Sequence, residues 1–80
     1  MRVRVFITPK KGVLDPQGKA IEHSLHALGF HEAHDVHLGK YVELALDSHE
    51  REPARQRVDD MCRKLLANGV IEDYRFEIEE

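Results

Sequence analysis

The sequence predicts a single α+β domain over residues 1–80, in which one antiparallel sheet carries two helices on one face. Apolar residues alternate with polar ones in four stretches, and they recur at steps of three and four in two others. These stretches follow one another as βαββαβ, and right-handed crossovers then place both helices on the same side of the sheet. The prediction is therefore a ferredoxin-like fold with a four-stranded sheet.

The four strands are predicted from this alternation. Residues 2–8 alternate apolar with mostly charged side chains, which is typical of a half-buried strand. Residues 34–47 predict two strands about a Gly39-Lys40 turn, because a two-residue Gly-X connection suits a type II′ hairpin. Residues 74–79 alternate again and predict the last strand.

The first helix is predicted over about 16–28. Asp15 is placed to cap its N-terminus, and Pro16 suits the first helical position because its missing N–H has no partner there. Gly29 can adopt the left-handed conformation that ends a helix, and Phe30 can then fold back on the last turn. The apolar stripe expected to face the sheet consists of Ile21, Leu25 and Leu28.

The second helix has two possible starts. Asp47 or Ser48 can cap an early start, or Glu52 can precede Pro53 at the first helical position. The helix is expected to end at Asn68-Gly69. Its buried stripe is predicted to consist of Ala54, Val58, Met61 and Leu65, widened by Cys62 and Leu66.

The composition argues against several functional classes. The formal net charge is −3 at pH 7, whereas a nucleic-acid-binding surface is usually strongly basic. The single cysteine, Cys62, cannot form an internal disulfide, and a lone thiol fits a reducing compartment. No apolar run resembles a signal peptide or a membrane span. We therefore expect a cytoplasmic protein that binds neither nucleic acid nor membrane.

Six histidines raise the question of a metal site. His23 and His26 share a helix face, but the histidines of residues 31–37 are three apart in a predicted loop and strand, where that spacing alternates faces. No cluster of cysteines or carboxylates completes a four-ligand set. Cys62 lies on the predicted buried stripe, where a thiol is unreactive. We expect no metal, no cofactor and no catalytic residue on this chain, so the sequence favours binding over catalysis.

The loop before the first helix is basic and sparsely covered. Gly18 lies in the first helical turn, where almost any other residue is a better helix former. Together with Gly12 it leaves a helix N-terminus that can hold an anion or admit another backbone, beside Lys10, Lys11 and Lys19. The alternative is a tight loop with solvated lysines. The segment is not a nucleotide-binding P-loop, because its spacing differs and no Ser or Thr follows Lys19.

The sheet face opposite the helices has no cover in this prediction. Its side chains are mixed in charge and carried on long stems, with two aromatic rings among them. We hypothesise that this face is the interface of a homodimer or tetramer, and a solvated sheet face is the alternative. The proposed interface residues are Arg2, Arg4, Phe6, Tyr41, Glu43 and Arg75.

Three motifs resemble a known family. GVLDPQGKAIEHSLHALGF at 12–30, VHLGKYVELALD at 36–47 and MCRKLLANGVIEDYRFEIEE at 61–80 resemble the PurS subunit of phosphoribosylformylglycinamidine synthase. They cover nearly the whole chain in the family's order. This chain departs from the family at Gly69, where the family usually has proline. The change affects only the local rigidity of the backbone, because glycine also ends a helix well.

The resemblance implies a non-catalytic subunit of a purine-biosynthetic ligase. In that enzyme a glutaminase subunit, PurQ, releases ammonia, and a synthetase subunit, PurL, uses ATP and Mg to install it on formylglycinamide ribonucleotide. The PurS dimer brings the two together. The residues expected to contact these partners, from exposure and motif position, are Lys10, Lys11, Gly12, Asp15, Gly18, Lys19, Gly39 and Lys40. The alternative is a homodimeric regulatory module that binds a small anionic ligand at the Gly12–Lys19 loop.

Overall fold

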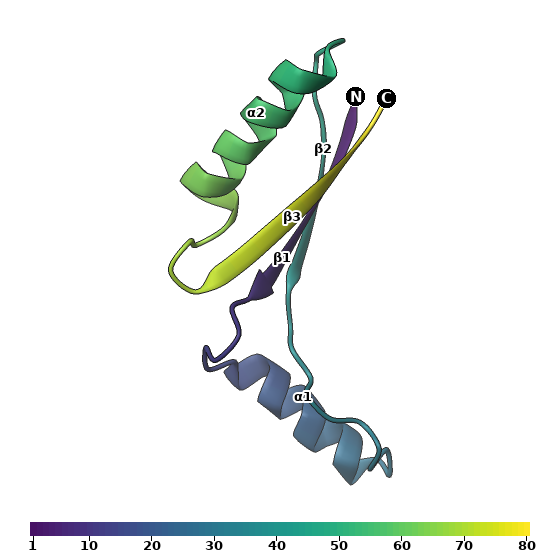
Figure 1. Ribbon diagram of the computed structural model, residues 1–80. Coiled ribbons are helices and arrows are strands. Elements are labelled where there is room, and N and C mark those ends of the chain that lie inside the picture. The colour runs from purple at the N-terminus through teal and green to yellow at the C-terminus, as the bar shows by residue number, and fades with distance from the viewer.

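The computed structural model describes residues 1–80 as a three-stranded antiparallel sheet with two helices (Figure 1). The strand order is β2-β1-β3, and both pairings are antiparallel. The elements along the chain are β1 (Arg2–Pro9), α1 (Pro16–Ala27), β2 (Lys40–Ala45), α2 (Arg51–Met61), a turn of π-helix (Cys62–Leu66) and β3 (Glu72–Glu79). The predicted α+β class is therefore confirmed, with one strand fewer than expected.

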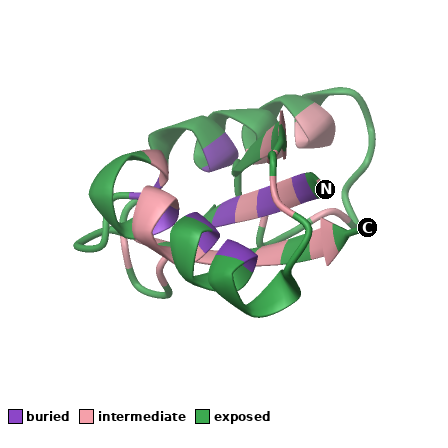
Figure 2. Ribbon diagram, turned by 90° about the horizontal axis from the view of Figure 1, so that it is seen from above, coloured by how far each residue is buried: buried purple, intermediate pink, exposed green.

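The core lies between β1 and α2. Alternate residues of the central strand point to one face and are almost fully buried, as the purple and pink bands along β1 show in Figure 2. The α2 helix contributes Ala54 and Val58 to the same core, and the π-helical turn after it contributes Cys62, as the apolar spacing predicted. The strand contributes Val3, Val5 and Ile7. The core is thin, because only 8 of the 80 residues are buried.

The fourth predicted strand, in residues 34–38, is absent, and no hairpin forms at Gly39-Lys40. This segment instead runs beside α1, where carboxylates satisfy its backbone donors. The Val36 N–H donates to Glu22 over 3.2 Å, and the Leu38 N–H donates to Asp15 over 3.0 Å. Because these N–H groups already have partners, the segment needs no strand partner, and the chain continues directly into β2 (Figure 1).

The prediction of two helices on one sheet face is also wrong. Only α2 covers the sheet, and α1 lies beyond the end of the strands (Figure 1). Gly18 is the only buried residue of α1. The three residues predicted to face the sheet therefore have no core to enter, and Ile21 and Leu28 stay 39% and 74% exposed.

Both ends of α1 follow the sequence prediction. The Gly18 N–H donates to the carboxylate of the N-cap residue Asp15 over 3.0 Å, and Pro16 occupies the first turn. At the other end Gly29 has a φ of 100°, and the N–H of Phe30 donates to the Leu25 carbonyl over 2.9 Å. The helix is thus specified locally, without support from the core.

The last turn of the second helical segment departs from its prediction at Leu65. The Ala67 N–H donates to the carbonyl of Cys62, five residues earlier, over 2.9 Å. This π-type bond adds a residue to the turn and changes the direction of its side chains, so Leu65 is 82% exposed instead of buried. The helix also begins at Arg51 with Glu50 as N-cap, between the two predicted starts.

A membrane span would need a longer and more apolar helix than any that this chain forms.

Candidate functional site

The residues predicted to contact partners gather where α1 joins the sheet. We call this region the junction, and it comprises residues 9–19, 35–40 and 71–73. Its parts converge because Ile7 pairs with Lys40 and Pro9 pairs with Glu72 in the sheet register. It surrounds a hollow of about 660 Å³ that carries acidic as well as basic side chains.

Two lysines of the junction are already paired. The ammonium of Lys10 lies 2.7 Å from the Asp73 carboxylate, and that of Lys40 lies 3.3 Å from the Glu72 carboxylate. Lys11 and Lys19 make no ion pair and are exposed. They are therefore the junction cations left for another molecule.

The N-terminus of α1 holds the chain's own carboxylate. Asp15 accepts from the backbone N–H groups of Gly18 and Leu38, and its side chain lies 3.4 Å from the His37 ring. These backbone hydrogen bonds, followed by the contact with His37, lower the pKa of Asp15 below its usual 3.8. Because a carboxylate already occupies the positive end of the helix, a second anion meets a neutralised site there.

Two junction glycines stand where backbones approach closely. A Cβ on Gly18 would lie 2.4 Å from the Val36 carbonyl oxygen, and one on Gly39 would lie 2.5 Å from that of Ile7. The sequence prediction that Gly18 admits another backbone is right, and that backbone belongs to the same chain. Because these two residues have no Cβ, the segment after α1 can lie directly against the helix at Gly18 and against β1 at Gly39.

The six residues predicted as an oligomer interface share the sheet face opposite α2, which we call the open face. Phe6 and Tyr41 lie side by side with ring centroids 5.2 Å apart, and the Arg75 guanidinium lies 4.0 Å from the Phe6 ring centroid. Arg4 pairs with Glu79 over 2.8 Å, and this contact raises the pKa of Arg4. The Tyr41 hydroxyl donates to Glu43 over 2.9 Å.

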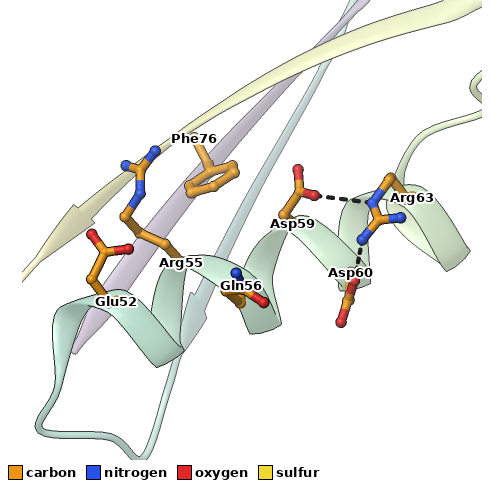
Figure 3. Close-up of a pocket in the computed structure, with 7 residues that line it drawn as sticks. All are labelled: Glu52, Arg55, Gln56, Asp59, Asp60, Arg63 and Phe76. Carbon is orange, nitrogen blue, oxygen red and sulfur yellow. Dashed lines mark hydrogen bonds and ion pairs between the residues drawn. The ribbon is translucent and has the colours of Figure 1, made fainter.

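A third surface, between α2 and β3, was not singled out from the sequence. Arg63 reaches both Asp59 and Asp60 there (Figure 3). The hydrogen bond to Asp59 is 3.0 Å long, and the Arg55 guanidinium lies 5.7 Å from the Phe76 ring centroid. The signal that could have found it is the spacing of these aspartates three and four residues before Arg63. A hydrogen bond from the Tyr74 hydroxyl, 2.5 Å long, lowers the pKa of Asp59. The carboxylate is thus held ionised, which suits structural pairing better than proton transfer.

The family model that matches this chain is PurS, described as phosphoribosylformylglycinamidine (FGAM) synthase, and it covers residues 2–80. The chain belongs to the PurS family. The PurS subunit of Bacillus subtilis (strain 168) is 49% identical over 99% of this chain and 93% of its own length. The solved B. subtilis PurS structure has a TM-score of 0.89 and covers 99% of this chain and 98% of that one. A chain of the solved PurLQS structure from Thermotoga maritima is 28% identical, with a TM-score of 0.87 and coverage of 95% and 93%.

The assignment confirms the resemblance drawn from the three motifs. PurS is a non-catalytic subunit of the ligase phosphoribosylformylglycinamidine synthase, in purine biosynthesis. In this PurS chain, no group of three or more His, Cys, Asp or Glu side chains could hold a metal ion. Burial is the main cause that raises the pKa of Cys62, so its thiol keeps its proton.

Proposed function

We propose that this PurS chain holds a PurQ-type glutaminase and a PurL-type synthetase together, so that ammonia passes from one to the other. The observation that carries this proposal is the likeness to a chain of the PurLQS structure of T. maritima. We still predict no catalytic, cofactor-binding or metal-binding residue on this chain. ATP and Mg belong on the synthetase partner.

An adaptor of this kind needs no reactive groups. Ammonia released into water is protonated and diffuses away, and ammonium is no longer a nucleophile. A rigid subunit that fixes the distance between two active sites avoids both losses. The paired surface charges of this chain suit binding of other proteins, since polar rims of interfaces carry such groups.

We further propose that the junction is the surface that meets the partner subunits. Lys11 and Lys19 are its exposed unpaired cations, and Gly12 lies in the same loop with a φ of 86° and open space around it. Such cations at an interface rim steer association with an acidic surface. The open face is proposed as a contact between copies, supported by its aromatic pair. The buried free thiol supports a cytoplasmic location.

The test is reconstitution of the synthase from separate subunits. Glutamine-dependent product formation is measured with and without this chain, and ammonium chloride is supplied in a parallel assay. We expect that omitting the chain abolishes the glutamine-dependent rate and leaves the ammonium-dependent rate of the synthetase. A full glutamine-dependent rate without the chain would refute the adaptor function.

A pair of variants tests the junction. Lys11→Gln with Lys19→Gln removes the unpaired cations there, and Arg55→Gln removes a cation on α2 as a matched control. We expect the junction variant to bind the partners at least ten-fold more weakly at low salt, and the control to bind normally. Equal binding by all forms would show that the partners dock elsewhere.

A further inference from the structure

The loop between the π-helical turn and β3 contains the single asparagine of the chain, and a glycine follows it (Figure 1). Asn68 and Gly69 are both exposed, and Val70 beside them is 81% exposed. A Cβ on Gly69 would meet nothing within 4 Å. The peptide bond between Asn68 and Gly69 is therefore open to water on an uncrowded part of the surface.

The backbone N–H of Gly69 makes no hydrogen bond within the chain, whereas the N–H groups on either side of it do. The Asn68 N–H donates to the Glu72 carboxylate over 2.8 Å, and the Val70 N–H donates to Oδ1 of Asn68 over 3.0 Å. A peptide nitrogen becomes a nucleophile only when it loses its proton, and a hydrogen bond that holds this proton hinders the loss. The Gly69 nitrogen has no such bond, and no Cβ shields it.

The side chain of Asn68 is held over the backbone that follows it. Its Oδ1 accepts from the N–H two residues later, so the side-chain amide forms an Asx turn around the Gly69 nitrogen. Addition of that nitrogen to Cγ of Asn68 places negative charge on Oδ1. The Val70 N–H already donates to this oxygen, and a donor in that position stabilises the charge as it develops.

A second amide residue followed by glycine, Gln17-Gly18, has a different environment. The Gly18 N–H donates to the Asp15 carboxylate over 3.0 Å, and a Cβ on Gly18 would clash with the carbonyl oxygen of Val36. Gln17 and Gly18 also lie in the first turn of α1, where the helical backbone opposes ring closure. The nitrogen after Gln17 is thus bonded and enclosed, and the nitrogen after Asn68 is neither.

We propose that Asn68 is a site of spontaneous deamidation. The Gly69 nitrogen gives its proton to hydroxide and bonds to Cγ of Asn68. The bond from Cγ to Nδ2 then breaks, and Nδ2 takes a proton from water and leaves as ammonia. Water opens the resulting five-membered succinimide at one of its two carbonyls, which leaves either aspartate or isoaspartate at position 68. Nothing is oxidised or reduced, and water and hydroxide are the only co-reactants.

The isoaspartate product alters the start of β3. Its chain passes through Cγ, so the backbone gains one methylene and the former main-chain carbonyl becomes part of a free carboxylate. In the unmodified chain that carbonyl accepts from the N–H groups of Ile71 and Glu72, over 3.1 and 2.7 Å. Glu72 in turn pairs with Lys40. We therefore expect isoaspartate to loosen this end of β3 and to leave the core of β1 and α2 intact.

The test of the modification is prolonged incubation of the full chain in mildly alkaline buffer, followed by digestion with trypsin and mass spectrometry. Trypsin cleaves after Lys64 and Arg75, so one peptide holds the single asparagine. We expect this peptide to gain one dalton and to separate into an aspartate and an isoaspartate form. Gly69→Pro has no N–H at that position and should give no product. Gly69→Ala has room for its Cβ and should react on the order of ten-fold more slowly, because the Cβ shields the nitrogen.

Two results would overturn the proposed site. One is a wild-type peptide that keeps its mass for as long as the Gly69→Pro peptide does. The other is a wild-type rate equal to that of Gly69→Ala, because the attacking nitrogen would then not be that of Gly69.

The structural consequence is measured on the isoaspartate form, which its additional negative charge separates from the unmodified chain in ion exchange. The amides of Ile71 and Glu72 should exchange their hydrogens about five-fold faster in it, and those of β1 should keep their rates. Asn68→Asp is the matched control, because it adds the charge without the methylene, and it should exchange as the wild type does. Unchanged exchange in the isoaspartate form would overturn the expected loosening of β3. No partner subunit enters these tests, so their failure is separate from failure of the adaptor function.

Discussion

Substituting Gly18 by alanine tests how the arm, by which we mean residues 14–38 around α1, is held against the rest of the chain. In an ordinary helix this change is stabilising by about 1 kcal/mol, because glycine is a poor helix former. Here the new Cβ would lie 2.4 Å from the carbonyl oxygen of Val36, whereas ordinary contact begins at 3.4 Å. The backbone of Val36 must therefore retreat by about 1 Å from the helix, which strains its hydrogen bond to Glu22.

The expected net effect follows from these two opposing contributions. Overpacking of this kind costs about 1–3 kcal/mol, which exceeds the helical gain and leaves a loss of about 1 kcal/mol in the arm. Opening of the arm is then about five-fold more frequent. Native-state hydrogen exchange measures it at the amides of Val36 and Leu38, which should exchange about five-fold faster, while the amides of β1 keep their rates.

The opposite result has a clear meaning. If Gly18 is only a poor helix residue, Gly18→Ala slows exchange in α1 and leaves Val36 and Leu38 unchanged, which would refute the close-approach argument. Gly69→Ala is the matched control, because a Cβ there meets nothing within 4 Å. It should leave the exchange of the arm unaltered.

Three further predictions concern stability. Val58→Ala removes a fully buried side chain and should lower the free energy of unfolding in urea by about 2 kcal/mol; a loss below about 0.5 kcal/mol would contradict the assigned core. Gly69→Pro occupies the second position of the turn in which the Ile71 N–H donates to Asn68, and should stabilise by about 0.4–1 kcal/mol in the same assay. Hydrogen bonds lower the pKa values of Asp15 and Glu22 in the folded state, so their stabilisation is present above the usual carboxyl pKa and lost as pH falls through the lowered values. Arm amides should therefore lose protection first between about pH 5 and pH 3, and uniform loss across the sheet would argue against this link.

Local signals in the sequence predicted the local structure well. The caps of α1 lie where Asp15 and Gly29 put them, because capping depends on residues adjacent in the chain. The core stripe of α2 follows its apolar period through Ala54 and Val58, and Cys62 continues it in the π-helical turn. The alternation of β1 predicted its buried face for the same reason.

The errors concern choices that periodicity does not decide. An apolar stripe shows that a helix needs a partner, but it does not show whether that partner is the chain's own sheet. The stretch before Gly39 alternates like a strand, yet carboxylates 14 and 23 residues earlier bind its N–H groups. Leu65 fits the α-helical period. It is exposed because the Ala67 N–H donates to the Cys62 carbonyl, five residues earlier, and so changes the direction of the side chains in this turn.

The partner-contact residues could be grouped only once the sheet register was known. Lys10 and Gly39 are far apart in sequence, and the structure brings them to the same end of the sheet because the end of β1 pairs with the start of β2. The charge pairs of Asp59 and Asp60 with Arg63 were readable from spacing and were not singled out, since such pairs usually lie on solvated helix faces.

The burial of this chain's one cysteine makes its thiol a probe of opening motions in the core. Cys62 has no exposed surface and holds its proton, so a thiol reagent can modify it only while the α2–sheet contact is open. Since the chain has no other thiol, the rate of alkylation reports opening of this contact alone. Motion of the distant arm should not change that rate.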